Sequence, residues 1–371
     1  MTAALTPMDV AGRLDRLRSH LGPAGCDALL VTNRSNIRYL TGFTGSAGML
    51  LVGPELALLV TDGRYRTQSE EQIAAAGVSA EVSIGGPADQ RQALAAAGSG
   101  FGRVGLEAAS VSWQLQRSLA TDVLGRAELV ATEDVVEELR RAKDAGEVAR
   151  IRAAAAVADR ALAAVLPLFG EGRSEAEVAL ALDSEMRRLG AEAPAFETIV
   201  ASGPNGAKPH ARPGPRPIVR GDTVVVDFGA TVDGYRSDMT RTFWVGERPE
   251  AELVRIFEVV EASQAAGVAA VAAGVSAAEV DATCRRVIAE AGWADQFVHG
   301  TGHGVGIDIH EAPAVSATST DTLGVDEVVT VEPGIYLPGR GGVRIEDTVV
   351  ITGDGVEPLT GFTKDPTLAV G

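Results

Sequence analysis

The chain has 371 residues, of which 46% are hydrophobic and 22% charged, so it can form two domains with separate cores. Its formal net charge of −17 argues against a nucleic-acid partner, because phosphates require basic patches. No apolar run reaches the ~20 residues of a membrane span, and the N-terminus lacks the apolar core and basic start of a secretory signal.

The chain has two cysteines, Cys26 and Cys284, which lie far apart in the sequence. Such a pair indicates no disulfide framework and is typical of a reducing compartment. Cysteine usage and the lack of an apolar span therefore predict a cytoplasmic protein that does not interact with membranes.

Residues 1–131 alternate between helical and strand patterns. Residues 8–21 place apolar side chains at helical spacing, and DALLVT at 27–32 is typical of a short buried strand. Residues 49–52 and 56–60 predict two more strands around a turn at Gly53-Pro54-Glu55. This alternation predicts a small α/β domain over residues 1–131.

From residue 132 the chain becomes a long, charged, alanine-rich helical stretch that breaks near Gly146. We place the domain boundary near residue 132. Residues 132–150 are then a linking helix, and Asp144 is the N-cap of the helix that follows. Further helices are expected at 174–189, 249–273 and 276–291.

Strands are also predicted in the C-terminal region. TVVVDFGA at 223–230 and YRSDMTRTFWV at 235–245 predict a β-hairpin across Val232-Asp233-Gly234. Residues 328–332 and 343–351 predict two more strands. The second domain, residues 132–371, is therefore expected to be α+β, with helices packed against a mostly antiparallel sheet.

Two aspartates, Asp227 and Asp238, flank the predicted hairpin turn. A hairpin loop of even length, which the Asp-Gly turn favours, would put both side chains on the same face. Asp227 follows three valines, and a buried carboxylate is costly unless it is paired or binds a cation. We expect the two carboxylates to bind cations together, and a pair of solvated strand acids is the alternative.

Glu332 and Glu346 form a second acidic pair, at an even separation in the sequence. This spacing requires a loop of odd length or a bulge, which the intervening glycines and prolines can supply. Arg344 lies two residues before Glu346 and so shares its strand face. It either orients a metal-bound carboxylate or forms an ordinary cross-strand ion pair.

Histidines are concentrated in glycine- and proline-rich loops of the C-terminal region, where four of the five occur: His210, His299, His303 and His310. Histidine in such loops is more often functional than histidine on an apolar face. The fifth, His20, belongs to the first predicted helix and is expected at the surface. GTGHGVG lacks the GxGxxG spacing of a nucleotide loop, and HExxH, CxxC and GxSxG motifs are absent.

Taken in order, these residues resemble the pita-bread metallopeptidase family, which includes methionine aminopeptidase, prolidase and aminopeptidase P. The resemblance covers about residues 140–360. RYLTGFTGSAG and TDGRY, which precede it, look like the creatinase-type N-terminal domain of the Xaa-Pro-cleaving branch. The resemblance implies a pita-bread catalytic domain that hydrolyses the Xaa-Pro bond at peptide N-termini.

The resemblance implies a dinuclear metal site with five protein ligands: Asp227, Asp238, His303, Glu332 and Glu346. Asp227 and Glu346 would bridge both ions. Carboxylates with one histidine suit Mn²⁺ or Co²⁺, and Zn²⁺ also fits. Two such ions lower the pKa of a shared water towards about 7, so that a bridging hydroxide can attack the peptide carbonyl.

The same resemblance implies that other residues act on the substrate. His310 would stabilise the oxyanion, Glu332 would transfer the proton of the water, and His210 would lie near the scissile bond. His299, which methionine aminopeptidases usually lack, and Arg344 match the Xaa-Pro branch. The implied partners are a proline-containing peptide and a second copy of the chain in a homodimer.

One position departs from the family pattern. Many prolidases carry an arginine four residues after the counterpart of His310, thought to bind the free carboxylate of a dipeptide, and here that residue is Ala314. We therefore favour an Xaa-Pro aminopeptidase, although another basic residue could bind the dipeptide carboxylate. The alternatives are an Xaa-Pro dipeptidase, a creatinase-like metal-free hydrolase and a non-catalytic binding module, and the complete ligand set argues against the last two.

Overall fold

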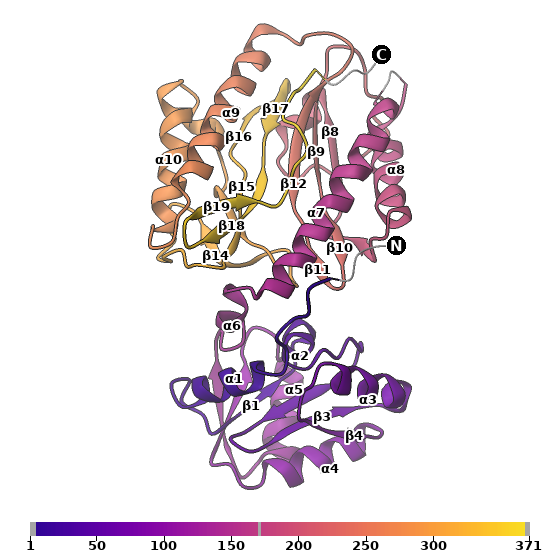
Figure 1. Cartoon of the computed structure of the whole chain (residues 1–371), viewed down its shortest axis with the longest axis vertical. Helices are drawn as coiled ribbons and strands as arrows, with labels where there is room; N and C mark the ends of the chain where they lie inside the picture. The colour runs from indigo at the N-terminus through magenta and orange to yellow at the C-terminus, as the bar shows by residue number, and fades with distance from the viewer. Residues whose placement is uncertain (1–4, 170–171, 368–371) are drawn as a thin grey trace. The chain divides into compact units, whose positions relative to one another are not determined.

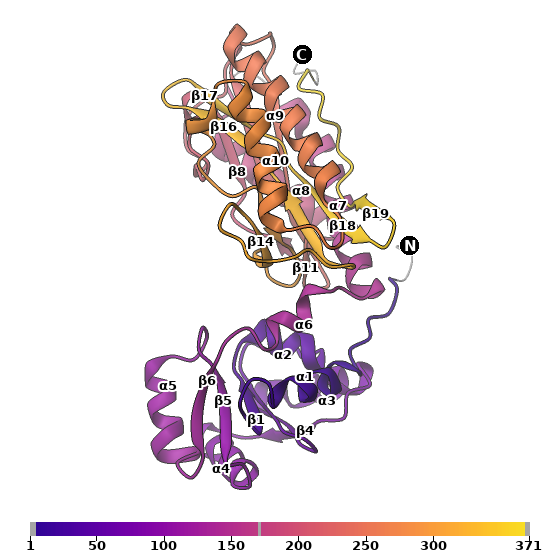
Figure 2. The same cartoon turned by 90° about the vertical axis from the view of Figure 1, so that its left-hand side faces the viewer.

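The computed structural model describes residues 5–169 and 172–367, which divide into two compact units (Figure 1, Figure 2). One unit is Met8–Arg140, and the other comprises the chain from Arg141 onward with the short segment before Met8. None of the helices in these described ranges is long and apolar enough to cross a membrane.

The N-terminal unit is an α/β domain, as the sequence pattern predicts. Its six-stranded mixed sheet has the order β4-β3-β2-β1-β5-β6. The strands are β1 (Ala28–Val31), β2 (Met49–Val52), β3 (Ala57–Thr61), β4 (Glu81–Ile84), β5 (Arg103–Glu107) and β6 (Glu128–Thr132). The helices are α1 (Arg13–Leu21), α2 (Arg34–Thr41), α3 (Arg66–Ala75), α4 (Pro87–Gly98) and α5 (Trp113–Ser118). The three predicted strands are confirmed, and His20 is exposed on α1 as expected.

The division between the units falls after Arg140, later than the predicted boundary at residue 131. Helix α6 (Glu137–Arg141) explains the difference. The amide of Asn36 donates to the carboxylate of Glu137 at 2.7 Å and accepts from Arg140 at 2.8 Å. The composition changes near residue 132, but these polar contacts keep the next residues in the N-terminal unit.

The linking helix predicted over residues 132–150 is interrupted before Asp144, earlier than the predicted break near Gly146. The chain leaves the helical conformation after α6 and resumes it in α7 (Ala145–Val165). Asp144 caps α7 as predicted, because its carboxylate accepts from the backbone N–H of Glu147 at 2.9 Å and the Glu147 carboxylate accepts from the N–H of Asp144. This reciprocal capping fixes where the helix begins.

The C-terminal unit is α+β, and every strand pairing described in it is antiparallel. One sheet has the order β12-β9-β8, another has the order β14-β13-β15-β18-β19, and β16 pairs with β17. A small sheet has the order β11-β10-β7. The first strands are β7 (Ala193–Pro194), β8 (Ile199–Ser202), β9 (Thr223–Phe228), β10 (Ala230–Val232), β11 (Tyr235–Arg236) and β12 (Met239–Trp244). The later ones are β13 (Gly302–Gly304), β14 (Glu311–Val315), β15 (Val328–Val331), β16 (Gly334–Leu337), β17 (Gly341–Arg344), β18 (Asp347–Thr352) and β19 (Gly355–Pro358).

Two pairs of helices cover these sheets, with the strands between them (Figure 1). Helix α7 and α8 (Glu175–Arg188) bury side chains such as Leu162 and Leu182 against Val226 of β9. Helices α9 (Ala251–Ala270) and α10 (Ala277–Glu290) pack in the same way against β15 and β18. Burying one such side chain contributes ~1.5–3 kcal/mol, so the two cores hold the intervening strands firmly in place.

Candidate active site

The first pair of acids is placed by a hairpin with a two-residue loop. Asp233 and Gly234 have φ angles of 44° and 76°, as a type I′ turn requires. The register of this hairpin pairs Thr240 with Asp227, so Asp238 lies diagonal to Asp227 on the same face of the ladder. The prediction of a shared face from an even loop is confirmed.

The second pair is placed by a hairpin with a three-residue loop, Pro338–Arg340, between β16 and β17. Gly334 pairs with Arg344 in β16 and β17, and Val331 pairs with Asp347 in β15 and β18. The same register therefore continues from one pair of strands to the other. That register puts Glu332 directly opposite Glu346. The odd loop that the sequence requires is therefore present, and no bulge is needed.

Asp238, Glu332 and Glu346 lie where the chain passes from one sheet to another. Asp238 separates β11 from β12, Glu332 follows β15, and Glu346 separates β17 from β18. The backbone N–H of Glu346 donates to the carbonyl of Thr240 at 3.1 Å, and that of Glu332 donates to Thr301 at 2.7 Å. The backbone stays hydrogen-bonded at these crossings while the side chains extend into the space between the sheets.

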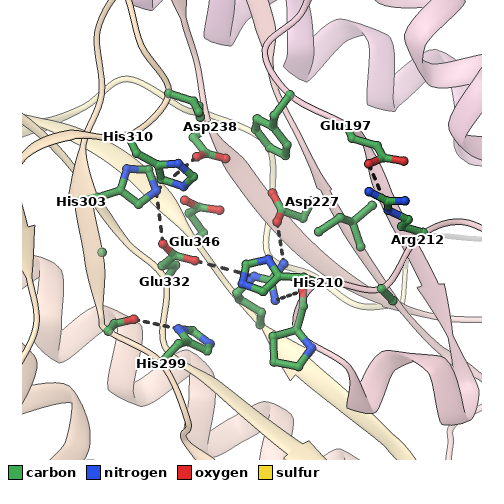
Figure 3. Close-up of a pocket in the computed structure, with 18 residues that line it drawn as sticks. Glu197, His210, Arg212, Asp227, Asp238, His299, His303, His310, Glu332 and Glu346 are labelled. Atoms are coloured by element: carbon green, nitrogen blue, oxygen red, sulfur yellow. Dashed lines mark hydrogen bonds and ion pairs between the residues drawn. The ribbon is translucent and has the colours of Figure 1, made fainter. Parts of the chain in front are cut away.

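All five predicted ligands line one cavity of about 450 Å³ (Figure 3). Carboxylate oxygens of Asp227, Asp238 and Glu346 lie within 4.8 Å of one another. The Nε2 atom of His303 is 3.6 Å from Asp238 Oδ2 and 3.5 Å from Glu332 Oε1. Residues more than 100 positions apart are therefore brought into a single cluster.

Unsatisfied polar atoms in this cluster fit divalent cations. Asp227 Oδ1, Asp238 Oδ1 and Glu346 Oε1 are buried and have no hydrogen-bond partner within the described residues. Each such oxygen costs ~1–3 kcal/mol unless something binds it. His303 Nδ1 lies 3.0 Å from the carbonyl oxygen of Gly304, and donation there leaves the Nε2 lone pair facing the acids. This is the arrangement of a metal-binding histidine.

Burial shifts the pKa values of these groups towards their neutral forms. Burial and the charge of Glu346 raise the pKa of Asp238 well above its usual range, and burial with the charge of Glu332 does the same for Glu346. Burial also raises the pKa of Glu332 to about 8 and lowers that of His303 to about 4. Cations would displace the protons that these carboxyl groups otherwise keep.

These shifts predict that the metal-free protein loses stability as pH rises from 6.5 to 8. Glu332 has an ordinary pKa of 4.5 and a folded-state pKa of about 8, so in this window the folded state binds more protons than the unfolded state. The free energy of unfolding then falls by about 1.4 kcal/mol per pH unit for each such group. Thermal unfolding in chelator measures this effect, which saturating Mn²⁺ should suppress. A melting temperature that is constant or rises over this window would contradict it.

Arg344 is the buried cation of the site. Its guanidinium donates to Asp227 Oδ2 at 2.6 Å, to Thr240 Oγ1 at 3.1 Å and to the Tyr336 hydroxyl at 2.8 Å. It also lies 3.9 Å from a carboxylate oxygen of Glu332. Arg344 on β17 forms this ion pair with Asp227 on β9, a strand of a different sheet, and the pair fixes one oxygen of Asp227 while the other stays unpartnered within the described residues.

Tyr336 is a site residue that the sequence reasoning missed. Its hydroxyl is 2.8 Å from His299 Nε2, and His299 Nδ1 is 2.7 Å from the carbonyl oxygen of Gly300. Burial and the charge of Arg344 lower the pKa of His299 to about 4, so the ring is neutral. Nδ1 then donates to Gly300 and Nε2 accepts from Tyr336, which itself accepts from Arg344. Tyr336 shares the strand face of Glu332, four residues earlier, and that spacing is the signal that could have identified it.

Helix α10 fastens the loop that carries His299. The Asp281 carboxylate accepts from the backbone N–H and the hydroxyl of Thr301, at 3.1 and 2.8 Å. Arg285, one helical turn later, pairs with Asp281 at 2.7 Å and donates to the carbonyl oxygens of Phe297 and His299. These bonds hold both ends of the loop, so the imidazole of His299 has a fixed position.

His310 faces the cluster beside His303, with the two ring centroids 4.4 Å apart (Figure 3). Burial and the nearby imidazole of His210 lower the pKa of His310, which favours its neutral form. The next residue, Glu311, forms an ion pair of 3.1 Å with the buried ammonium group of Lys143. Lys143 therefore helps to fix the loop on which His310 lies.

His210 lines the cavity but is exposed to solvent. Its loop is organised by Glu175, a buried carboxylate that accepts from the backbone N–H and hydroxyl of Ser202, each at 2.8 Å, and from the N–H of Gly214 at 3.2 Å. The structure thus brings all nine candidate residues to one cavity. Sequence reasoning did not identify the other lining side chains, which include Phe196, Glu197, Ile199, Arg212 and Ile309.

Comparison with family models gives two matches that together span most of the chain. Residues 149–353 match metallopeptidase family M24. Residues 13–142 match the creatinase/prolidase N-terminal domain. The two matches meet near the division between the compact units.

Similar proteins and structures cover nearly the whole chain. An uncharacterized peptidase, YqhT of Bacillus subtilis, is 40% identical over 95% of this chain and 99% of its own. An Xaa-Pro dipeptidase of Pyrococcus horikoshii is 36% identical over 90% of this chain and 92% of its own. The structure of an Xaa-Pro dipeptidase from Bacillus anthracis has a TM-score of 0.92 at 38% identity, covering 96% and 98%. The structure of an X-Pro aminopeptidase from Thermotoga maritima has a TM-score of 0.86 at 35% sequence identity, and the match covers 95% of this chain and 99% of that chain.

Proposed function

The chain belongs to metallopeptidase family M24, and on that premise we propose that it is an Xaa-Pro aminopeptidase. It would release the first residue of peptides whose second residue is proline. The observation that best supports this proposal is the cavity that His303 and His310 line together with three buried carboxylate oxygens that have no hydrogen-bond partner within the described residues. Family resemblance also supports a homodimer as part of the proposal.

We propose that the cavity holds two divalent cations. Four carboxylates and one imidazole would bind them, and this donor set suits Mn²⁺ or Co²⁺, with Zn²⁺ also compatible. The ligands would be Asp227, Asp238, His303, Glu332 and Glu346. When bound, such cations supply Lewis-acid charge and lower the pKa of water at the site.

Glu332 and His310 have the functional groups that amide hydrolysis requires, and both line the cavity. The carboxylate of Glu332 lies in the cluster, 3.5 Å from His303 Nε2, where it can take a proton from water and release it to the leaving nitrogen. Burial lowers the pKa of His310 and so favours its neutral form, whose ring N–H can donate to the oxyanion that develops on the carbonyl. His210, on the exposed side of the cavity, would lie beside the leaving nitrogen.

Proline in the second position has no N–H, so the protein cannot recognise it through an amide donor. A rigid wall that fits the pyrrolidine ring is the alternative. Both ring nitrogens of His299 are hydrogen-bonded, and its ring packs edge to face on Phe297 at 5.1 Å between centroids. We propose that His299 forms part of the proline pocket instead of acting as an acid or a base.

An Xaa-Pro dipeptidase is the second candidate. The names of the Pyrococcus relative and of the Bacillus anthracis structure favour it. Ala314 favours the aminopeptidase, because it provides no cation for the free carboxylate of a dipeptide. Both candidates require the same cations, catalytic residues and proline pocket, so substrate length separates them.

Cleavage of matched peptides tests the proposed function. With Mn²⁺ present, Ala-Pro-Ala is expected to show kcat/KM at least ~100-fold above that of Ala-Ala-Ala, because the fixed wall of the site fits proline. Chromatography of released alanine measures both rates and the rate for Ala-Pro. Equal turnover of the two tripeptides would refute proline selectivity. Turnover of Ala-Pro alone would replace the aminopeptidase by the dipeptidase.

A further inference from the structure

An exposed ion pair lies at the edge of the catalytic cavity. Arg212 Nε is 3.4 Å from Glu197 Oε2, and the two side chains are 84% and 66% exposed. Both residues line the cavity, and the pair lies to one side of Asp227 and His210 (Figure 3). None of the steps proposed above uses either residue.

Arg212 is the accessible cationic side chain among the described residues that line this cavity. The other guanidinium that lines it belongs to Arg344, which is 3% exposed and is hydrogen-bonded to Asp227 and Tyr336. The remaining charged side chains among the described lining residues are carboxylates. At the edge of the cavity, away from the proposed cations, an anionic group of a substrate would therefore find its complementary charge at Arg212.

The geometry of the pair allows a substrate to replace Glu197. Ion pairs this exposed contribute little to stability and are weakened by salt, so the pair can open at small cost. A guanidinium binds a carboxylate through two parallel hydrogen bonds, and a substrate carboxylate can take that position. Glu197 then acts as a competitor that a bound substrate displaces.

We propose that Arg212 binds a carboxylate on the leaving-group side of the substrate and that Glu197 competes for it. This proposal rests on the proposed function, because Arg212 follows His210 by two residues on the loop assigned to the leaving nitrogen. The carboxylate is either the C-terminus of an Xaa-Pro dipeptide or an acidic side chain directly after proline. Arg212 thus supplies the cationic side chain that is missing at position 314, where this chain has alanine. The aminopeptidase would then also accept dipeptides.

Two pairs of peptides that differ in a single charge test this proposal. Ala-Pro is compared with Ala-Pro-NH₂, and Ala-Pro-Glu-NH₂ with Ala-Pro-Gln-NH₂, all at saturating Mn²⁺ and low salt. The quantity measured is the ratio of KM for the neutral peptide to KM for the charged one. The variants are Arg212→Ala, Arg212→Lys and Glu197→Gln. Arg220→Ala is the matched control, since Arg220 belongs to another exposed ion pair and does not line the cavity.

Arg212→Ala is expected to lower this ratio about tenfold for at least one peptide pair, with a much smaller change in kcat. Arg212→Lys should recover part of the loss, and Glu197→Gln should raise the ratio about twofold because the competitor is gone. If the variants change the KM ratio only for the Ala-Pro pair, Arg212 binds the C-terminal carboxylate. If they change it only for the glutamate pair, Arg212 binds the acidic side chain. The proposal fails if all variants keep the ratios of the wild type. If the wild-type protein cleaves none of the four peptides, the proposed function itself is refuted.

Discussion

Replacing Asp238 by asparagine is expected to lower kcat for Ala-Pro-Ala by at least ~1000-fold and to remove one of the two bound cations. One carboxylate oxygen of Asp238 is buried and has no hydrogen-bond partner in the part of the chain that the structure describes, and its other oxygen lies 3.6 Å from His303 Nε2. Asparagine keeps the shape of the side chain but removes its charge and presents an amide N–H₂ in the cluster. Loss of a single ligand should therefore disable the whole centre.

The same variant separates metal binding from folding. Burial raises the pKa of Asp238, so the metal-free protein favours its neutral form, which asparagine imitates. Without metal, the variant is expected to melt at or above the wild-type temperature, whereas the rise caused by Mn²⁺ should shrink. Asp183→Asn is the matched control, because Asp183 is half-buried on α8, accepts from Thr198 at 2.6 Å and does not line the cavity. An Asp238→Asn protein with normal metal content and a tenth or more of wild-type kcat would exclude this ligand.

Removal of divalent cations by a chelator is expected to abolish cleavage of Ala-Pro-Ala, and Mn²⁺ or Co²⁺ should restore it. The carboxyl groups of Asp238, Glu332 and Glu346 then take up protons, because burial and mutual repulsion raise their pKa values. The three buried oxygens that have no hydrogen-bond partner among the described residues also lose the cations that would bind them. The restored rate, measured after desalting and metal addition, controls for damage to the fold. Full activity in chelator would instead support a metal-free hydrolase of the creatinase type.

Side-chain parity allowed the sequence to predict both acidic pairs. The Asp233-Gly234 turn implies an even loop, and the even separation of Glu332 and Glu346 implies an odd one. The structure has loops of two and three residues, and each pair shares a face. Parity is a local property of a strand, so it can be derived from spacing without knowledge of the fold.

Contacts between distant segments could not be derived in this way. The two hairpins meet because two separate helix layers hold their sheets together, and no local pattern encodes that meeting. Tyr336 becomes a site residue only through His299 and Arg344, and its sequence signal is limited to a shared strand face with Glu332. The observed division between the units lies after Arg140, and the predicted one at residue 131, for a similar reason. The composition changes near residue 132, but hydrogen bonds of Asn36 hold α6 in the N-terminal unit.

Titration of the metal-free protein with Mn²⁺ at pH 8, followed by the cleavage of Ala-Pro-Ala, tests the dinuclear centre most directly. Four carboxylates and one imidazole in one cavity predict negligible activity before addition and a plateau at two Mn²⁺ per chain. Activity that is already complete without added metal, or that does not depend on Mn²⁺ at any ratio, would contradict a metal centre as the source of catalysis.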